Sequence, residues 1–235
     1  MKLAISQPTF LPWQGYFALI NYVNEFVFLD NVQFNKRSWQ QRNYIIINSK
    51  KNNITIPVKT KNKFFQKINE VEIDYNNFDT KKFLFKIETN YKRSPFFDEF
   101  YIVIKNEFLK EYKYLSDLNI NLIKTISRSL NINTPFVKSS EVIKFSNKDK
   151  INFLLEILRN RKADSYITTL GSKEYLGNLI KFPNSDISIK YFEYKSTLHK
   201  QNSDEFQENL SIIDLIFNVG IDSRENLIKN LSVFN

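Results

Sequence analysis

The chain has 235 residues, among them four glycines, one histidine and no cysteine, and its formal net charge at pH 7 is +9. Without cysteine it can hold neither a disulfide framework nor a thiolate metal site, and one histidine cannot supply two imidazole ligands, so no metal site is expected. The glycines are too few for the glycine-rich phosphate-binding motifs. The positive charge suggests polyanionic partners such as nucleic acid, phosphate or a lipid surface, although the basic residues are spread along the chain.

No apolar segment approaches the roughly 20 residues that a membrane-spanning helix needs. The first apolar run stops at Gln7 and Pro8, which is too short for the core of a signal peptide. The sequence therefore predicts a cytoplasmic protein. Hydrophobic residues make up 42% of the chain and charged residues 25%, which is typical of a globular fold with a sizeable core.

The first thirty residues predict a strand, a helix and a second strand. Residues 3–5 form a short apolar run, and a helix is predicted over 13–23 because its apolar residues recur at spacings of three and four. Residues 26–29 are continuously apolar, which is typical of a strand buried on both faces. Together these elements predict a βαβ unit.

The next hundred residues predict two insertions into the alternating pattern. Residues 44–47 and 53–58 read as the strands of a hairpin, and 71–74 can add a third strand. The segment 79–132 reads as a helical insert of three helices, predicted over 79–91, 95–111 and 115–130. The hairpin insertion is assigned to residues 31–75.

The last third returns to alternating strands and helices. Strands are predicted at 136–137, 165–168 and 187–192, and helices at 148–158, 173–180 and 210–219, the last one stopped by Gly220. The predicted fold class is α/β: a mostly parallel Rossmann-like sheet with a β-hairpin insertion and a helical insert, in a single domain spanning 1–235.

In an open parallel sheet, ligands bind beyond the carboxyl ends of the strands. Gln7 follows the first strand there, and the helix that begins at Trp13 turns its free N–H groups to the same edge, which favours an anion. Gly15 lies in the first turn of this helix. Its missing side chain either lets an anion approach the backbone or allows close helix packing.

The second strand is followed by Asp30 and then by the densest set of polar and cationic residues in the chain. The candidate binding residues in this set are Gln33, Lys36, Arg37, Ser38, Trp39, Gln40, Arg42 and Asn43. Lys36 and Arg37 suit a phosphate, and Trp39 could stack on a base or sugar ring. The alternative is a solvated loop anchored by a buried tryptophan.

Further candidates come from the last third of the chain. Thr168 ends a strand, and a glycine, Ser172 and Tyr175 follow it, so this turn is either another anion site or an ordinary helix cap. His199 is the one side chain whose ordinary pKa lies near neutrality. Asp214 and Asn218 share one face of the last predicted helix and point either to solvent or into the site.

Four segments resemble, in order, the WbqC-like family of bacterial proteins: QPTFLPWQGYF, FLDNVQFNKRSWQQRNYI, YITTLGSKEYL and LSIIDLIFNVG. The resemblance spans nearly the whole chain. It implies a role in the synthesis of O-antigen and other surface polysaccharides, with transfer of an acyl or aminoacyl group such as glycyl to the amino group of a nucleotide-linked amino sugar. The family pattern falls on most of the candidates above and on Tyr16 and Gln201. The chain departs from it at Thr168 and Thr169, where the family often has a glycine-containing turn, and near Ser196, where it often has a His-Pro pair.

The leading hypothesis is therefore an enzyme acting on a nucleotide-linked amino sugar. Asp30, and also His199, are its candidate catalytic residues, with Asp30 as general base because burial at a strand end can raise its pKa. The expected partners are the nucleotide sugar and an activated acyl donor, either an adenylate, a coenzyme A thioester or an aminoacyl-tRNA. No cofactor can be named, and the oligomeric state is not indicated. The alternatives are a basic nucleic-acid-binding module and a non-catalytic scaffold of a polysaccharide-synthesis assembly.

Overall fold

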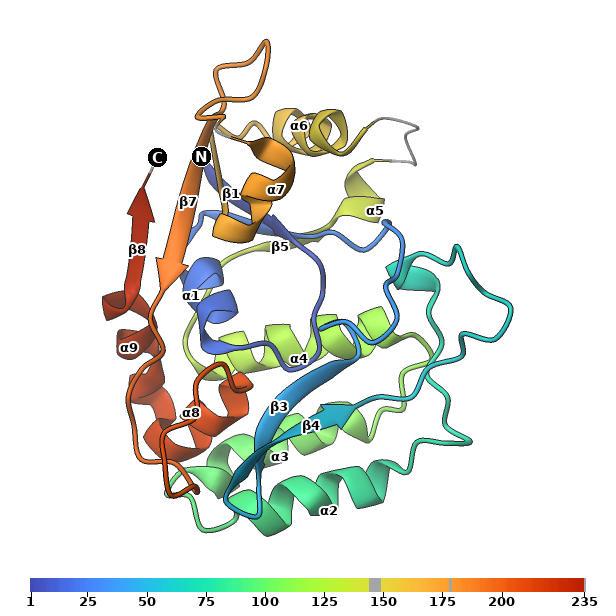
Figure 1. The fold of residues 1–235 in the computed structure, drawn as a ribbon, viewed down its shortest axis with the longest axis vertical. Helices are drawn as coiled ribbons and strands as arrows, with labels where there is room; N and C mark the ends of the chain where they lie inside the picture. Colours follow the sequence, from blue (N-terminus) through green and yellow to red (C-terminus); the bar gives the residue numbers. More distant parts are fainter. Residues whose placement is uncertain (144–148, 178, 235) are drawn as a thin grey trace.

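The computed structural model describes residues 1–143, 149–177 and 179–234 (Figure 1). Its centre is a six-stranded sheet with the order β5-β2-β1-β6-β7-β8. The strands are β1 (Lys2–Ser6), β2 (Glu25–Phe28), β5 (Phe136–Lys138), β6 (Ser165–Thr169), β7 (Ser188–Tyr194) and β8 (Leu231–Phe234). All neighbouring pairs are parallel except β7 and β8, which are antiparallel. The predicted α/β class with a mostly parallel sheet is confirmed.

The strand order reverses direction at β1. The chain moves from β1 outward through β2 to β5, and then returns to the other side of β1 to form β6, β7 and β8. Loops leaving β1 and β6 therefore diverge at their carboxyl ends, which opens the crevice where ligands bind in sheets of this topology. The strand order alone thus singles out the residues after Ser6 and Thr169.

The sheet is buried on both faces because apolar side chains alternate along its central strands. In β1, Leu3 and Ile5 belong to the apolar cluster on one face and Ala4 to the cluster on the other. One face is covered by α1 (Gln14–Tyr22), α8 (Ile212–Val219) and α9 (Ser223–Lys229). The other carries α5 (Ser139–Val142), α6 (Lys150–Asn160) and α7 (Lys173–Leu176). The apolar run of β2 is fully buried, as its pattern predicts.

The predicted hairpin and helical insert lie together below the sheet in the view of Figure 1. The hairpin consists of β3 (Arg42–Ile47) and β4 (Lys50–Thr55), and the insert of α2 (Thr80–Tyr91), α3 (Phe97–Phe108) and α4 (Leu115–Ser129). Their apolar side chains join the cluster on the α1 face of the sheet. The loop 31–43 and the start of β3 are thereby held close to the carboxyl ends of β1 and β2.

Several details differ from the sequence prediction, including the second hairpin strand, which was predicted at 53–58 and is Lys50–Thr55. Residues 71–74 form only isolated bridges, with Val58 and with Tyr114, because no neighbouring strand runs alongside them. The helix predicted over 173–180 ends at Leu176, where Gly177 adopts a φ of 59° and breaks the helix, and residue 178 lies outside the described residues. The helix predicted over 148–158 is α6, and residue 148 also lies outside the described residues.

No helix in the described ranges combines the length and the apolar character that crossing a bilayer would require.

A buried carboxylate stabilises the helical insert. Glu107 in α3 accepts hydrogen bonds from Lys110 Nζ at 2.9 Å, Tyr112 Oη at 2.8 Å and Thr125 Oγ1 at 2.9 Å. Burial alone would raise the pKa of Glu107, but these hydrogen bonds outweigh it and hold the pKa below its usual value of 4.5. The ionised form is therefore favoured by folding.

Replacing Glu107 with glutamine is expected to lower the free energy of unfolding at neutral pH by about 1–3 kcal/mol. Because the folded-state pKa is lowered, the wild type has this contribution in full above about pH 4.5 and loses it as the pH falls through the folded-state value. The variant should have a flatter stability profile in acid, measured by urea unfolding at several pH values. Glu99→Gln, at an exposed position on the same helix, is the control. Identical profiles for the two variants would contradict the assignment.

Candidate functional site

A hollow made of three adjoining pockets crosses the carboxyl edge of the sheet. The central pocket, about 320 Å³, lies between the ends of β1 and β6, at the reversal of the strand order. It shares Gln7, Leu29 and Lys150 with a larger pocket toward β2. On its other side it shares Ser6, Thr9 and Thr169 with a third pocket toward α1. Pockets therefore lie where the topology predicts a crevice, and neighbouring pockets share lining residues.

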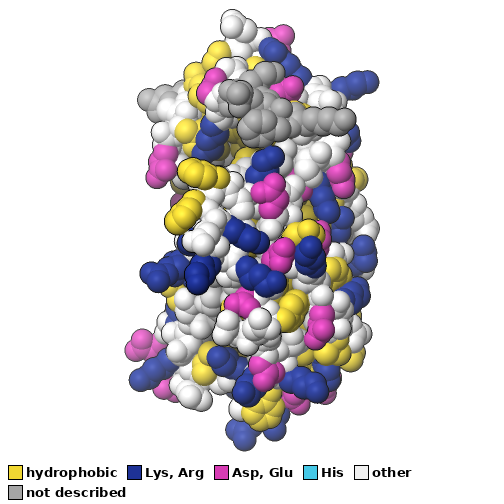
Figure 2. All heavy atoms as spheres, turned by 90° about the vertical axis from the view of Figure 1, so that its right-hand side faces the viewer, with side chains coloured by type: hydrophobic (Ala, Val, Ile, Leu, Met, Phe, Trp, Pro, Cys, Tyr) yellow, Lys and Arg dark blue, Asp and Glu magenta, His cyan; other side chains and the backbone are white. Residues whose placement is uncertain are grey.

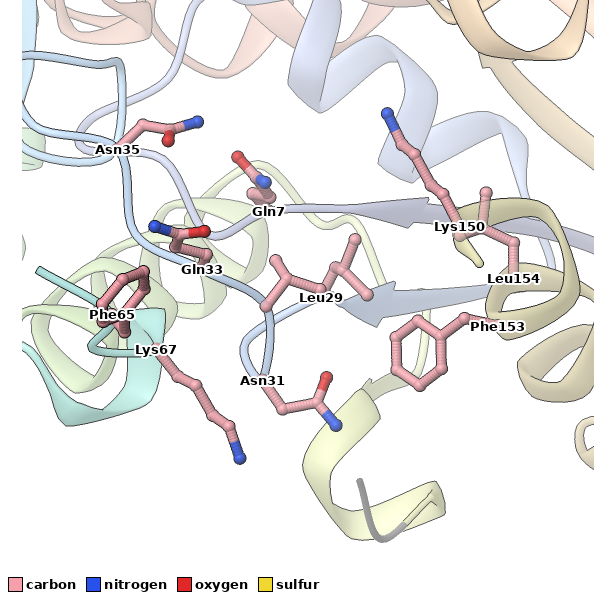
Figure 3. Close-up of a pocket in the computed structure, with 11 residues that line it drawn as sticks. Gln7, Leu29, Asn31, Gln33, Asn35, Phe65, Lys67, Lys150, Phe153 and Leu154 are labelled. Carbon is pink, nitrogen blue, oxygen red and sulfur yellow. The ribbon is translucent and has the colours of Figure 1, made fainter. Parts of the chain in front are cut away.

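The pocket toward β2, here called the amide pocket, has a volume of about 650 Å³. Its polar lining consists of the side-chain amides and amines of Gln7, Asn31, Gln33, Asn35, Lys67 and Lys150. Its apolar lining is Leu29, Val32, Phe65, Phe153 and Leu154. Figure 3 shows Gln7 at the end of β1, with Gln33 and Asn35 to one side and Lys150 to the other.

This lining suits an anionic, hydroxyl-rich ligand. Side-chain amides both donate and accept hydrogen bonds, as the hydroxyl groups of a sugar require. Lys67 and Lys150 supply positive charge from two different segments, and the described residues that line the pocket include neither aspartate nor glutamate. The two phenylalanines add flat apolar surface. A sugar phosphate combines all these properties.

The pocket toward α1, here called the indole pocket, has a volume of about 340 Å³ and is lined by both tryptophans of the chain, Trp13 and Trp39. Tyr16 and Asn43 also line it. Trp39 is 51% exposed, so it is not the buried anchor that a purely structural loop would have. Two indole rings around a cavity of this size suit a flat heterocycle.

The loop 31–43 and the segment after β1 are joined by direct hydrogen bonds. Gln40 Nε2 donates to Gln7 Oε1 at 2.7 Å, and the backbone N–H of Phe10 donates to the carbonyl of Trp39 at 2.8 Å. Asn43 Nδ2 donates to the carbonyl oxygens of both Phe10 and Leu11, at 3.0 and 2.7 Å. The structure thus brings the indole of Trp39 and the end of β1 into one site.

Tyr16 fixes the backbone beside Gln7. Its hydroxyl donates to the Gln7 carbonyl oxygen at 2.9 Å. Burial raises the pKa of Tyr16, with an opposing contribution from Ser6, so the hydroxyl keeps the proton that this hydrogen bond needs. The turn after β1 is held in place from α1.

Of the two roles open for Gly15, the structure supports close packing. A Cβ atom at this position would lie 2.3 Å from the ring of Trp13, which folds back over the first turn of α1. The indole therefore occupies the space through which an anion would approach the glycine. Glycine is required here so that Trp13 can form a wall of the indole pocket.

The end of β6 contributes a chain of hydroxyl groups. Thr168 Oγ1 and Ser172 Oγ are 2.6 Å apart, and Tyr175 Oη donates to Ser172 Oγ at 3.0 Å. The Lys150 amine lies 3.3 Å from the centroid of the Tyr175 ring, and Glu174 also lines the central pocket. The Ser172 hydroxyl is engaged in this chain and does not cap α7. Thr168 and Tyr175 lie in the hollow, as predicted for binding residues.

Several predicted binding residues lie elsewhere. Lys36 and Arg37 are exposed on the loop and, within the described part of the chain, line none of the three pockets. Ser38 turns back and donates to the carbonyl of Asn35 at 2.7 Å. Arg42 is half-buried in β3, also outside the pockets. The cations that face the hollow are instead Lys67 and Lys150.

Asp30 is buried beneath the amide pocket. Its carboxylate accepts from the Ser140 backbone N–H at 3.0 Å and from the Ser140 hydroxyl at 2.6 Å. The Ser139 hydroxyl lies 3.0 Å from Asp30 Oδ1 and 2.7 Å from Oδ1 of Asn31. Asp30 thus holds the start of α5 against the end of β2 and supports the orientation of Asn31, which lines the pocket.

The other predicted catalytic residue belongs to a buried cluster, here called the Asp214 network, made of Asp214, His199, Gln201 and Tyr91. Asp214 Oδ1 is 2.8 Å from His199 Nε2 and 2.9 Å from Gln201 Nε2, and Oδ2 accepts from Tyr91 Oη at 3.0 Å. His199 Nδ1 lies 2.8 Å from the carbonyl of Thr197. Burial, and then the charge of Asp214, raise the pKa of Tyr91.

The Asp214 network ties the C-terminal segments to the hairpin and the helical insert. Asp214 is fully buried in α8, Tyr91 ends α2, and the Tyr91 hydroxyl also accepts from the backbone N–H of Ile46 in β3 at 2.8 Å. Asn218 donates to the backbone carbonyl of Asp214. Asp214 therefore points neither to solvent nor, among the described pockets, into the hollow.

The sequence prediction did not select several polar residues of the hollow, among them Asn31, Asn35, Lys67, Lys150 and Glu174. Lys150 opens α6, which follows β5 only after the intervening α5, so the strand-end rule applied to β5 would not have reached it. Asn31 comes directly after Asp30, which the strand-end rule did select. Lys67 carried no local signal because it reaches the site through the long connection after the hairpin.

Comparison with known proteins identifies a family for this chain. The sequence profile described as the WbqC-like protein family matches residues 7–226. The chain is 32% identical over 228 residues to the uncharacterized protein Rv1507c of Mycobacterium tuberculosis (strain ATCC 25618 / H37Rv), covering 96% of this chain and 97% of that protein. No solved structure is significantly similar to it. The chain belongs to the WbqC-like family.

Proposed function

We propose that this protein is an enzyme of surface-polysaccharide biosynthesis that transfers an acyl or aminoacyl group, such as glycyl, to the amino group of a nucleotide-linked amino sugar. Membership of the WbqC-like family supports the polysaccharide context. The observation that carries the proposal is the hollow itself, which joins an indole-lined pocket to a cationic, amide-lined pocket across the carboxyl edge of the sheet.

The order of the pockets matches the order of groups in a nucleotide sugar. The base stacks in the indole pocket against Trp39 and Trp13. The diphosphate crosses the central pocket within reach of Lys150, and the sugar enters the amide pocket, where Gln7 and Asn31 bind its hydroxyl groups. Among the described residues, Lys67 also lines the amide pocket, where its positive charge suits a phosphate.

The transfer requires a proton acceptor and an activated donor. The sugar ammonium loses a proton, its nitrogen forms a bond to the acyl carbon, and the bond from that carbon to the leaving group breaks, with the leaving group taking the electron pair. Glu174 lines the central pocket and is our candidate for the proton acceptor. Because the chain has no cysteine, the acyl group arrives already activated, as an adenylate, a coenzyme A thioester or an aminoacyl-tRNA.

The two catalytic residues predicted from the sequence take no direct part in the transfer in this proposal. Asp30 is a positioning residue that acts through Asn31, whose side chain it helps to orient by way of Ser139. His199 has a structural role in the Asp214 network, which holds the C-terminal segment in place. Neither is expected to touch the substrate.

The test combines binding and product analysis. Purified protein is titrated calorimetrically with a panel of nucleoside diphosphate amino sugars and with the matching sugar 1-phosphates, and mixtures with acyl donors are analysed by mass spectrometry. Trp39→Ala should weaken binding of the nucleoside diphosphate sugars by about 10–100-fold, because it removes a stacking partner of the base, and should leave the sugar 1-phosphates unaffected. A mass gain on the sugar identifies the reaction.

Phe85→Ala is the control, since Phe85 is an exposed aromatic residue on α2, outside the hollow. The assignment fails if the wild type binds none of the nucleoside diphosphate sugars, or if both substitutions weaken binding equally.

A further inference from the structure

The connection between β4 and Ile68 carries the most exposed aromatic residues of the described chain. Residues 59–67, here called the 59–67 loop, read KTKNKFFQK, with four lysines and no acidic residue. Phe64 is 68% exposed and Phe65 86% exposed. Large apolar side chains in water are unfavourable, and two adjacent ones on a surface loop mark a place where another surface is bound.

The backbone of the loop is fixed at both ends by the rest of the fold. The N–H of Lys59 donates to the carbonyl of Glu72 at 2.9 Å, and the N–H of Phe34 donates to the carbonyl of Gln66 at 3.0 Å. Gln33 Nε2 donates to the carbonyl of Phe64 at 3.3 Å. With the backbone held in this way, both phenylalanine side chains remain largely exposed.

Positive charge surrounds the two rings. The Lys36 amine lies 5.4 Å from the centroid of the Phe64 ring, and Lys61 and Lys63 are exposed just before it in the chain. The Glu72 carboxylate lies 3.0 Å from the Lys59 amine and 3.9 Å from that of Lys63, and the Glu70 carboxylate accepts from the backbone N–H of Lys67 at 2.8 Å. Figure 2 shows the face on which the loop lies, where Lys and Arg side chains lie next to hydrophobic ones, with Asp and Glu side chains among them.

We propose that the 59–67 loop docks this protein on an anionic lipid surface. Phe64 and Phe65 enter the headgroup region, and Lys61 and Lys63 beside them pair with anionic headgroups, which is the arrangement of amphipathic segments that lie at membrane interfaces. Phe65 also lines the amide pocket, so docking places the opening of that pocket at the lipid surface.

The geometry favours a membrane over a nucleic acid. Proteins bind single strands in a basic groove that follows the backbone, with aromatic rings along it as stacking platforms. Here the two rings are adjacent in sequence on a loop that projects from the right side of the view in Figure 1, and the lysines flank them within the same short segment. A projecting aromatic pair with basic flanks fits a soft anionic surface better than an extended strand.

The test measures sedimentation of the full chain with large vesicles. Vesicles of phosphatidylglycerol and phosphatidylcholine in equal parts should bind the wild type, pure phosphatidylcholine vesicles should not, and high salt should weaken the binding. Substituting serine at both Phe64 and Phe65 should lower the vesicle-bound partition coefficient at least about tenfold, because the apolar insertion is lost. The double substitution Lys61→Glu with Lys63→Glu should lower the partition coefficient to a similar extent, because it places negative charges next to the anionic headgroups.

Matched controls separate the loop from general effects of charge and hydrophobicity. Phe85→Ser, and Lys81→Glu with Lys86→Glu, make the same changes at exposed positions on α2. Circular dichroism melts verify that all variants fold. The proposal is overturned if the wild type does not bind anionic vesicles, or if the control variants lose vesicle binding as much as the loop variants do. Binding of single-stranded oligouridylate is measured with the same variants. A loss of binding that is confined to this nucleic acid would also overturn the proposal. Nucleotide-sugar binding is measured separately, so its failure would affect the proposed function alone.

Discussion

Replacing Asp214 with asparagine is expected to lower the free energy of unfolding by about 3–5 kcal/mol. Hydrogen bonds from Tyr91, Gln201 and His199 converge on the two carboxylate oxygens of this fully buried residue. An asparagine offers one oxygen, and its amide nitrogen would face a donor at the second position. Urea unfolding followed by tryptophan fluorescence measures the loss.

Asp222→Asn provides the matched control, because it removes the same charge from an exposed position shortly after α8. It should change stability by no more than about 0.5 kcal/mol. If the Asp214 variant does not fold at all, Tyr91→Phe removes one hydrogen bond of the network and should cost about 1 kcal/mol. Equal stability of the Asp214 and Asp222 variants would show that the network does not stabilise the fold.

His199→Gln separates a structural role of the network from a catalytic one. A folded His199 variant should keep its affinity for nucleotide sugars and its rate of transfer, since the Asp214 network lines none of the three described pockets.

The combined substitution of alanine for Lys67 and Lys150 is expected to weaken binding of a nucleoside diphosphate sugar at least about 100-fold. Both amines line the amide pocket, and each charge-assisted hydrogen bond to a phosphate contributes about 1.5–3 kcal/mol when water is partly excluded. The loss should be smaller for an uncharged nucleoside, because that ligand has no phosphate to pair with. Calorimetric titration of both ligands gives the two dissociation constants.

The sequence analysis predicts instead that Lys36 and Arg37 bind the phosphate, and this opposing hypothesis provides the control. Lys36→Ala with Arg37→Ala removes the two cations that follow β2 in the chain, which are exposed and line none of the described pockets. This pair should change the affinity less than threefold, within about 0.6 kcal/mol. If substituting Lys36 and Arg37 weakened the binding of the nucleoside diphosphate sugar more than substituting Lys67 and Lys150, the phosphate site would lie on the loop 31–43 and not in the hollow.

The sheet could be predicted because its strands carry a strong local signal. The apolar runs at β1 and β2 are buried on both faces, and apolar residues recur at spacings of three and four in the helix between them, in which Gln14–Ile20 are all buried. The strand β8 was missed because it pairs only with β7 and is half-exposed, so little apolar pattern is needed to form it. The single turn of α5 was missed because four residues are too few to show a helical period.

The candidate site was predictable to the extent that it follows strand ends. Gln7, Thr168 and Trp39 could be placed near one another because the carboxyl ends of parallel strands share one edge of the sheet. Lys67 could not, since only tertiary packing brings the 59–67 loop beside β1 and β2. Spacing along α8 correctly placed Asp214 and Asn218 on one face, but a helical period cannot distinguish a ligand site from a buried polar network.

The central position of β1 in the sheet affects when the chain can complete its fold during synthesis. Strand β1 (Lys2–Ser6) needs β6 (Ser165–Thr169) as its neighbour, and β6 is synthesised much later because the two strands are far apart in the chain. Until then one side of β1 has open N–H and C=O groups, and pairing across so long a separation is slow and prone to misassembly. Gln7 and Thr168 meet only when this late pairing is complete, so a nascent chain acquires its ligand crevice near the end of folding.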